Sequence, residues 1–173
     1  MGNLEREMMK WDNSSVRRSD RLLDQSRALE LLRTAEWGVL SMTDNDGSPY
    51  GVPLNYVWDG EAALYVHCAP DGRKLRCLDQ EPRVSFCIVG KVNLLPSRFT
   101  TEYESIVLNG VVTRHLSMEE KHHALELLLE KLSPHDKVVG MKYAAASFHR
   151  VEILRLDVVS WSGKCKRVAA ADR

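Results

Sequence analysis

The sequence predicts a mainly β fold, a six-stranded antiparallel barrel with peripheral helices packed outside it. Three observations support this prediction: six segments have strand-like patterns, few helical segments interrupt them, and turn signals separate the first three at hairpin spacing. An open α+β sheet and a doubly wound α/β fold are the alternatives. The tight turns argue against the second, because parallel strands need crossovers of about a dozen residues or more.

Composition favours one globular domain with small-molecule or protein partners. The chain has 173 residues, of which 44% are hydrophobic, and its 24 basic residues balance 24 acidic ones. A neutral chain has no overall field to attract nucleic acid or an anionic membrane, and no apolar run is long enough to span one. The four cysteines show neither CxxC spacing nor a disulfide framework, so we expect free thiols and a cytoplasmic location.

The chain divides into three parts. They are a flexible N-terminal arm at residues 1–19, a folded domain at residues 20–165 and a C-terminal tail at residues 166–173. Because the arm is polar and irregular, we expect it to become ordered only against the body of the protein or a partner subunit.

A helix and three strands open the domain. Apolar residues recur at helical intervals from residue 24 to residue 35, and Asp24 or Ser26 can cap this helix. The strands are predicted at residues 38–43, 49–58 and 61–68, joined by turns at residues 44–47 and 59–60 into a three-stranded meander. Pro53 cannot donate to a ladder, so the second strand should carry a bulge or an unpaired edge.

The third strand continues through a glycine turn into a basic helix. Pro70, Asp71 and Gly72 separate the strand from a helix whose first residues are Arg73 and Lys74. The unpaired N–H groups and partial positive charge of a helix start attract anions, and two basic side chains add full charges there. The stretch therefore predicts a phosphate site, with an ordinary exposed turn as the alternative.

The second half of the chain adds three strands and two helices. We expect strands at residues 83–89, 103–114 and 148–160, with a loop at residues 91–101 and a bulge or bend at Asn109 and Gly110. Ser117 and Glu120 form a capping-box pattern for an amphipathic helix that stops before Pro134, and a shorter helix covers residues 137–146.

Three motifs follow one another along the chain: GVLSMTDNDGSPYGVPLNYVWDGEAALYVHCAPDGRKLRCL, then YESIVLNGVV, then WSGK. In this order and separation they resemble the FMN-binding split-barrel family of the pyridoxamine 5'-phosphate oxidase type. RRSDR at residues 17–21 is similar to the nitroimidazole-resistance (Nim) branch of that family. The resemblance covers nearly the whole chain after residue 16. It implies a six-stranded split β-barrel, a homodimer with two flavins, and FMN as the cofactor, with FAD as the alternative.

The resemblance also implies which residues form the site. One segment lies along the edge of the isoalloxazine ring, the end of the next strand lies beside the flavin, and the glycine turn holds its phosphate. A later strand approaches the cofactor near the dimer interface, and the C-terminal stretch closes the site from the partner subunit. In this order, the implied cofactor-binding residues are Val52, Pro53, Leu54 and Asn55; His67, Cys68 and Ala69; Gly72, Arg73 and Lys74; Ser105; and Trp161 and Lys164.

Single residues in this set have two interpretations each. His67 is the candidate catalytic residue, because a strand-end imidazole next to a cofactor can donate a proton or a hydrogen bond to substrate, but it can equally be a structural histidine. Cys68 is a reactive thiol or a small buried filler, and Trp161 stacks on a ring system or fills the core. His122 and His123 are consecutive on a helix and cannot chelate together, so no metal site is expected.

The implied function is a flavin-dependent oxidoreductase that reduces a small-molecule electron acceptor, such as a nitroaromatic or quinone-like compound. The C-terminal WSGKCKRVAAADR lacks the arginine-containing signature of oxidases that act on pyridoxine phosphate, which argues against pyridoxamine phosphate as substrate. One alternative is a non-catalytic flavin or haem carrier or sensor, with His67 or His149 as a haem ligand. Another is a barrel without cofactor that acts through its dimer surface.

Overall fold

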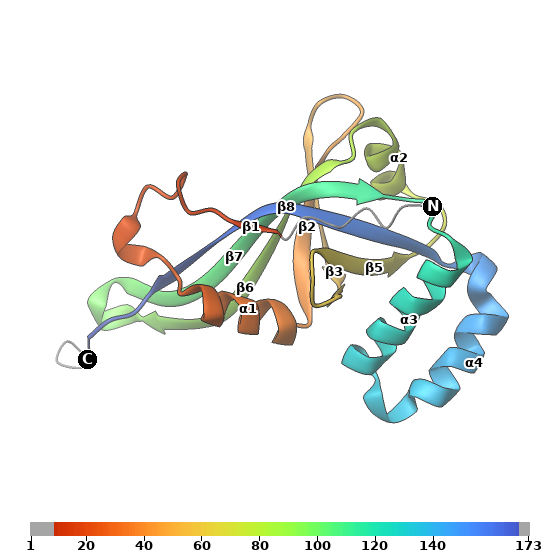
Figure 1. Ribbon diagram of the computed structural model, residues 1–173. Coiled ribbons are helices and arrows are strands. Elements are labelled where there is room, and N and C mark those ends of the chain that lie inside the picture. The colour runs from red at the N-terminus through yellow and green to blue at the C-terminus, as the bar shows by residue number, and fades with distance from the viewer. Residues whose placement is uncertain (1–8, 170–173) are drawn as a thin grey trace.

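A computed structural model describes residues 9–169 of the chain, apart from the side chains of Ser147 and His149. Within this range eight strands form one sheet, and four α-helices lie around it (Figure 1). The strands are β1 (Lys10–Trp11), β2 (Trp37–Thr43), β3 (Pro49–Asn55), β4 (Val57–Trp58), β5 (Ala63–Cys68), β6 (Arg83–Leu95), β7 (Thr100–Thr113) and β8 (Glu152–Lys166). The helices are α1 (Gln25–Thr34), α2 (Arg73–Gln80), α3 (Met118–Leu132) and α4 (Lys137–Ser147). The predicted mainly β fold with peripheral helices is confirmed.

The sheet is antiparallel along the strand order β3-β2-β6-β7-β8-β5-β4, and the short β1 pairs in parallel with β8. It does not close in the described part of the chain, because β3 and β4 end the order without pairing with each other. The predicted count of six strands is therefore corrected to eight. Two residues of the predicted arm supply β1, and the predicted strand over residues 49–58 is divided into β3 and β4.

The predicted three-stranded meander is wrong. β3 pairs with β2 and β4 pairs with β5, so the two hairpins lie at opposite ends of the strand order. Tyr56 separates them, since its side chain is fully buried and its hydroxyl donates to the carbonyl oxygen of Leu32 at 2.7 Å. The other edge of β5 is occupied by β8, where Leu64 pairs with Leu156. Burial of Tyr56 under α1 thus divides into two strands a segment whose sequence pattern predicts one continuous strand.

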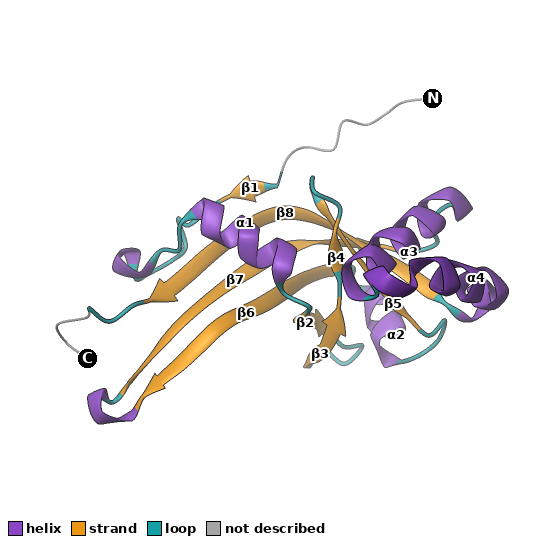
Figure 2. Cartoon of the chain, turned by 90° about the horizontal axis from the view of Figure 1, so that it is seen from below, coloured by secondary structure: helices purple, strands orange, loops and turns teal. Residues whose placement is uncertain are grey.

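The loop predicted at residues 91–101 is also wrong. β6 and β7 continue as one long hairpin to a 3-10 turn at Pro96–Arg98, and this hairpin extends away from the helices α3 and α4 (Figure 2). Leu94 pairs with Thr101, and Asn93 donates to the carboxylate of Glu102 at 2.8 Å. Cross-strand contacts therefore hold the pairing beyond the last buried residue of β6.

Several local predictions are confirmed. Asp24 caps α1 by accepting hydrogen bonds from the backbone N–H groups of Ser26 and Arg27, and Ser117 caps α3 by accepting from that of Glu120. The pairing of β7 with β8 shifts register between Asn109 and Gly110, as the predicted bulge requires. The last strand begins later than predicted and runs to Lys166, because Phe148–Arg150 form a helical turn.

The helices cover the inner face of the sheet in two places. α1 packs its buried residues against the core side chains of β2, β6, β7 and β8, which include Phe86, Leu108 and Trp161. A second cluster forms where α3 contacts β5, around Tyr65 and Ile153. None of the helices in residues 9–169 is both long and apolar enough to cross a membrane.

Candidate functional site

The glycine turn between β5 and α2 has the geometry that an anion site needs. Gly72 has a φ of 142°, a conformation that side-chain-bearing residues rarely adopt, and a Cβ built there would meet nothing within 4 Å. The turn therefore faces open space. α2 begins at Arg73, and the first N–H groups of a helix lack intrahelical partners and carry partial positive charge.

Arg73 connects this turn to the β2–β3 hairpin. Its Nε and Nη2 donate to one carboxylate oxygen of Asp44, at 2.7 and 2.6 Å, and its guanidinium lies over the ring of Tyr50, 4.2 Å from the ring centre. Asp44 follows β2 directly, and Tyr50 belongs to β3. The predicted ring-edge strand and the predicted phosphate turn are therefore adjacent in space.

His67 and Cys68 end β5 beside the same turn. His67 is exposed and Cys68 is half-buried. Partial desolvation and the nearby Lys74 ammonium lower the pKa of His67, so its imidazole is neutral near pH 7. Burial raises the pKa of Cys68, which favours the thiol over the reactive thiolate. The exposed Ala69 follows, and together these residues border the turn.

The other predicted residues of β3 lie at the edge of the sheet. Val52 pairs with Leu40 and Pro53 with Val39 in an unbroken register, so Pro53 makes no bulge. β3 ends the strand order, which leaves its outer edge without a strand partner in the described residues. Of the two possibilities for Pro53, the unpaired edge is the one observed. Asn55 closes the strand by donating to the carbonyl oxygen of Glu36 at 3.0 Å.

The remaining predicted site residues are far from this turn in the same chain. Cys68 pairs with Glu152 on β8, whereas Ser105 pairs with Lys164. About a dozen residues of β8 separate these two positions, which is about 40 Å of extended strand. One chain therefore does not bring Ser105 and Lys164 together with Arg73.

Trp161 fills the core. Its side chain is 1% exposed, and its ring meets that of Trp11 edge to face with the ring centres 4.5 Å apart. Of the two interpretations of Trp161, this geometry matches the core-filling one.

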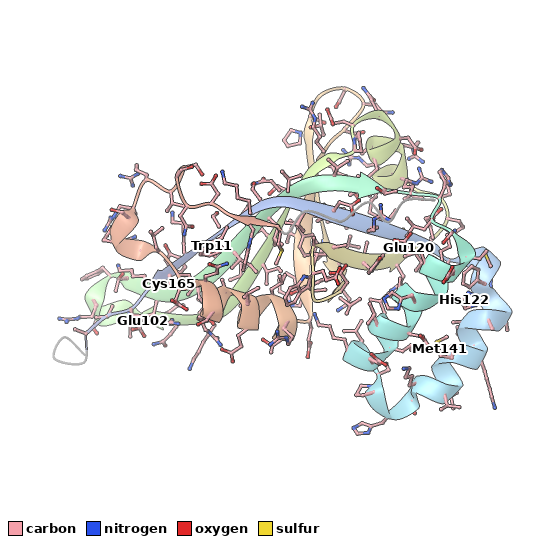
Figure 3. The ribbon with its side chains drawn as sticks, viewed as in Figure 1. Trp11, Glu102, Glu120, His122, Met141 and Cys165 are labelled. Carbon is pink, nitrogen blue, oxygen red and sulfur yellow. The ribbon has the colours of Figure 1, made fainter. Side chains whose placement is uncertain are left out.

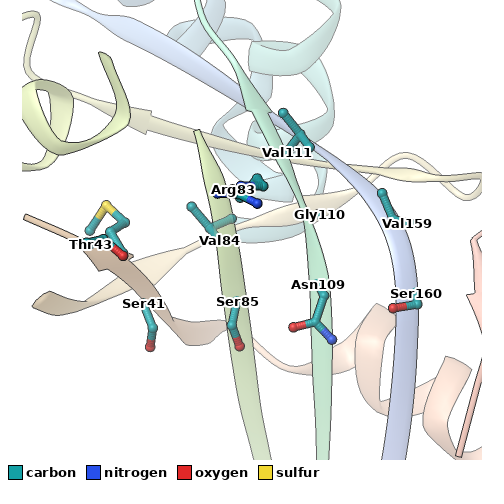
Figure 4. Close-up of a pocket in the computed structure, with 11 residues that line it drawn as sticks. Ser41, Thr43, Arg83, Val84, Ser85, Asn109, Gly110, Val111, Val159 and Ser160 are labelled. Carbon is teal, nitrogen blue, oxygen red and sulfur yellow. The ribbon is translucent and has the colours of Figure 1, made fainter. Parts of the chain in front are cut away.

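Ser105 and Lys164 point to the outer face of the sheet, because their neighbours along each strand point into the core. This outer face is open where β2, β6, β7 and β8 lie side by side, and it is hollowed by a shallow pocket of about 480 Å³ (Figure 4). The residues that line the hollow include small polar side chains and valines, among them Ser41, Ser85, Asn109, Ser160, Val111 and Val159.

A second polar cluster lies at the other end of the sheet. Glu104 is 1% exposed and accepts hydrogen bonds from Arg27 and Arg167. Glu102 accepts from the backbone N–H of Val168 at 2.9 Å. Glu102 lies near the tip of the long hairpin, far from Glu120 on α3 (Figure 3). The two glutamates thus attach the end of β8 and the residues after it to β7.

Sequence reasoning missed Asp44 and Tyr50. The sequence pattern predicts only a turn at Asp44 and only a strand at Tyr50. No local pattern relates either residue to Arg73, which follows Asp44 by 29 positions. A basic residue at an anion site often carries an acidic or aromatic neighbour, but a single sequence does not identify which one.

The donor set at the turn fits a flavin phosphate. The open space at Gly72, the start of α2 and the cations Arg73 and Lys74 provide backbone and side-chain donors for an anion. The unpaired edge of β3 lies beside them and offers backbone groups to a planar heterocycle. Among the described side chains, no three His, Cys, Asp or Glu residues are placed to hold a metal ion.

Solved structures with the same fold include three proteins relevant to this site. A protein from Bacteroides thetaiotaomicron, described as a candidate 5-nitroimidazole antibiotic resistance protein, is 23% identical, with 84% of this chain and 86% of that chain covered and a TM-score of 0.67. A FAD-binding protein from Mesorhizobium loti is 23% identical, with coverages of 85% and 98% and a TM-score of 0.62. A FAD and haem binding protein from Mycobacterium smegmatis is 19% identical, with coverages of 88% and 78% and a TM-score of 0.68.

At this level of identity the solved structures establish the fold alone. No curated protein matches the chain. The family model for pyridoxamine 5'-phosphate oxidase, however, matches residues 24–165, which include both the glycine turn and β8 as far as Cys165. The match spans most of the chain and agrees with the observed sheet. The chain belongs to the pyridoxamine 5'-phosphate oxidase family.

Proposed function

We propose that this chain is a flavin-binding oxidoreductase that reduces a small-molecule electron acceptor. The observation that carries the proposal is the cluster of anion-binding groups at the start of α2, Arg73 and Lys74, next to the free edge of β3. The same fold binds FAD in the proteins from Mesorhizobium loti and Mycobacterium smegmatis, which supports a flavin here. Four free cysteines support a reducing, cytoplasmic location.

In this proposal each group has a defined role. The backbone N–H groups at the start of α2, with the side chains of Arg73 and Lys74, hold the phosphate of FMN, or of FAD as the alternative, while the Gly72 N–H donates to the Asp71 carboxylate at 2.7 Å. The edge of β3 from Val52 to Asn55 faces the ring, and His67, Cys68 and Ala69 lie beside it. When bound, the flavin supplies the electron transfer, so the chain itself needs no nucleophile.

His67 is the proposed catalytic residue. Its pKa is lowered, so the neutral imidazole can donate one N–H to an acceptor near the ring while its other nitrogen accepts a hydrogen bond. The side chain is exposed at the end of β5, where a substrate can reach it. The variant His67→Gln should keep the flavin spectrum and lose at least tenfold in turnover of the acceptor.

The proposed active form is a homodimer. Ser105 and Lys164 lie on the open outer face of the sheet and are too distant from Arg73 to act on the same flavin within one chain. If two copies join through this face, each can contribute these two residues to the flavin of the other. The proposal therefore includes two flavins per dimer.

A nitroaromatic compound is the proposed class of acceptor. The similarity in fold to the candidate 5-nitroimidazole resistance protein and the RRSDR segment at residues 17–21 support it. Neutral His67 beside the flavin would donate a hydrogen bond to a nitro oxygen, and the protons that nitro reduction consumes would come from the solvent.

An absorption spectrum tests the proposal. The purified protein, alone and after incubation with FMN or FAD, should show flavin bands that bleach with dithionite and recover when a nitroaromatic is added without oxygen. Replacing both Arg73 and Lys74 with alanine should weaken FMN binding about 100-fold, because two charge-assisted contacts are lost. Lys142→Ala, an exposed lysine on α4 outside the turn, is the control and should bind FMN normally.

Three results would contradict the proposal. A Soret band in place of flavin bands would indicate a haem carrier. Bound flavin that no acceptor reoxidises would indicate a carrier or sensor without turnover. No chromophore after incubation with either flavin would indicate a protein that acts through its surface alone.

A further inference from the structure

Asp44 places a negative charge at the turn that is proposed to receive a phosphate. Its side chain is 19% exposed and lies at the end of β2, where its backbone N–H donates to the carbonyl oxygen of Ser48 at 2.8 Å. A carboxylate here would repel a phosphate, so it favours phosphate binding only if a second effect outweighs the repulsion. Its contacts indicate what that effect is.

Four donors reach the Asp44 carboxylate. They are the backbone N–H of Asn45 at 2.8 Å, the Cys77 thiol at 3.4 Å, and Nε and Nη2 of Arg73. The Asn45 N–H and then the Arg73 guanidinium lower the pKa of Asp44, so the carboxylate is ionised at neutral pH. Much of its charge is therefore compensated by donors within the protein, and solvent ions screen part of the remainder because the side chain is partly exposed.

Arg73 is held on two sides by the β2–β3 hairpin. Asp44 occupies the edge formed by Nε and Nη2, and Tyr50 covers one face of the guanidinium at 4.2 Å. Among the described residues, Nη1 has no hydrogen-bond partner, so the opposite edge is available to an anion. A guanidinium on four rotatable bonds normally loses conformational freedom when it binds, and a side chain that is already fixed loses less.

We propose that Asp44 is a positioning residue for the phosphate of the bound flavin and acts by holding Arg73, with Tyr50, in its binding orientation. The inference rests on the proposed function and extends it, because it assigns a role in phosphate recognition to a hairpin outside the predicted phosphate turn. Two opposite contributions meet at Asp44. Repulsion would make its removal strengthen phosphate binding, and fixing Arg73 makes its removal weaken it.

The test compares FMN with riboflavin, which has the same ring but no phosphate. In fluorescence-quenching titrations, Asp44→Ala should raise the Kd for FMN about tenfold and leave the Kd for riboflavin within about twofold of wild type. Asp46→Ala is the matched control in the same turn, since the Asp46 carboxylate accepts hydrogen bonds from Ser48 and, within residues 9–169, makes no contact with Arg73, so it should not affect either ligand. Tyr50→Leu keeps the Asp44 carboxylate, and it should likewise raise the Kd for FMN relative to the Kd for riboflavin.

A double variant separates positioning from hairpin damage. Once Arg73 is alanine, adding Asp44→Ala should cause no further loss of FMN affinity, because Asp44 acts only through Arg73. Equal losses for FMN and riboflavin, unchanged FMN binding, or tighter FMN binding in Asp44→Ala would each overturn the inference.

Inorganic phosphate distinguishes failure of this inference from failure of the proposed function. Phosphate should raise the melting temperature of the flavin-free wild type and of Asp46→Ala, and should have less effect on Asp44→Ala. If the wild type binds neither flavin but shows this phosphate response, the flavin proposal fails, and Asp44 positions Arg73 for the phosphate of another ligand. If phosphate stabilises wild type and Asp44→Ala equally, the role of Asp44 is refuted.

Discussion

Glu104 illustrates how a charged residue is stabilised inside this fold. Its carboxylate is 1% exposed and accepts from Nε and Nη2 of Arg27, at 3.1 and 2.5 Å, and from Arg167 at 2.7 Å. The hydrogen bonds from Arg27 and then from Arg167 outweigh burial and lower the pKa of Glu104 to about 2. A Cβ at Gly90 would lie 2.7 Å from its Cγ, so glycine leaves room for the carboxylate.

We expect Glu104→Gln to destabilise the protein by about 2 kcal/mol at pH 7. Glutamine keeps the shape but offers two guanidinium groups only a neutral acceptor in a buried place. Since the folded-state pKa of about 2 lies below the ordinary 4.5, the contribution of Glu104 is complete above pH 4.5 and is lost as the pH falls towards 2. Urea unfolding of both proteins between pH 7 and pH 3 should therefore show a difference that shrinks with acid.

Glu81 provides the matched control for this prediction. Its pKa is also lowered to about 2, chiefly by hydrogen bonds from Arg83, but the side chain of Arg83 is 79% exposed. Water and salt screen such a pair, so Glu81→Gln should change stability much less than Glu104→Gln. Equal losses in the two variants would show that burial of Glu104 is not the cause.

At the scale of secondary-structure elements, the β-bulge between β7 and β8, whose extra residue is Val159 of β8, depends on a glycine of β7. A Cβ at Gly110 would lie 2.1 Å from the carbonyl oxygen of Asp157 on β8, and that oxygen belongs to the paired backbone. Gly110→Ala should therefore destabilise the fold by about 1–3 kcal/mol, the range for overpacking. Gly51→Ala in β3 is the control, because its Cβ would make only ordinary contacts, the nearest at 3.5 Å.

Thermal unfolding checks this prediction. Both substitutions reduce the freedom of the unfolded chain to the same extent, so the difference in melting temperature between the two variants reports the clash. A melting temperature for Gly110→Ala equal to that of Gly51→Ala would mean that β7 and β8 separate at the bulge without cost.

The elements that could be predicted from sequence are those whose signals are local. The caps at Asp24 and Ser117 and the bulge at Gly110 depend on a few adjacent residues, and each prediction is confirmed. The break at Tyr56 and the extension of β6 beyond Val89 could not be predicted in this way. Both follow from contacts between segments distant in sequence, burial under α1 in one case and pairing with β7 in the other.

At the scale of the whole molecule, the candidate site also contains residues that local sequence predicts and residues that only long-range contacts bring together. Gly72, Arg73 and Lys74 are consecutive, so a turn pattern predicts them as a group. Asp44 becomes their neighbour only when the β2–β3 hairpin packs on α2, and Ser105 can reach them only across an interface. In the proposed dimer, each flavin site would combine the glycine turn of one chain with Ser105 and Lys164 on the outer face of the other chain's sheet.

The oligomeric state therefore tests whether the proposed flavin site is shared between two chains. Val159 lies in the hollow of the open face and is 64% exposed, so a lysine there should fold normally but place a charge in the proposed interface. Val139 on α4 is 68% exposed and lies outside that hollow, which makes Val139→Lys the matched control. In sedimentation experiments, wild type and Val139→Lys should be dimers, and Val159→Lys should shift towards monomer and lose FMN in parallel. A monomeric wild type that binds FMN fully would refute a shared site, and a dimer insensitive to Val159→Lys would place the interface on another surface.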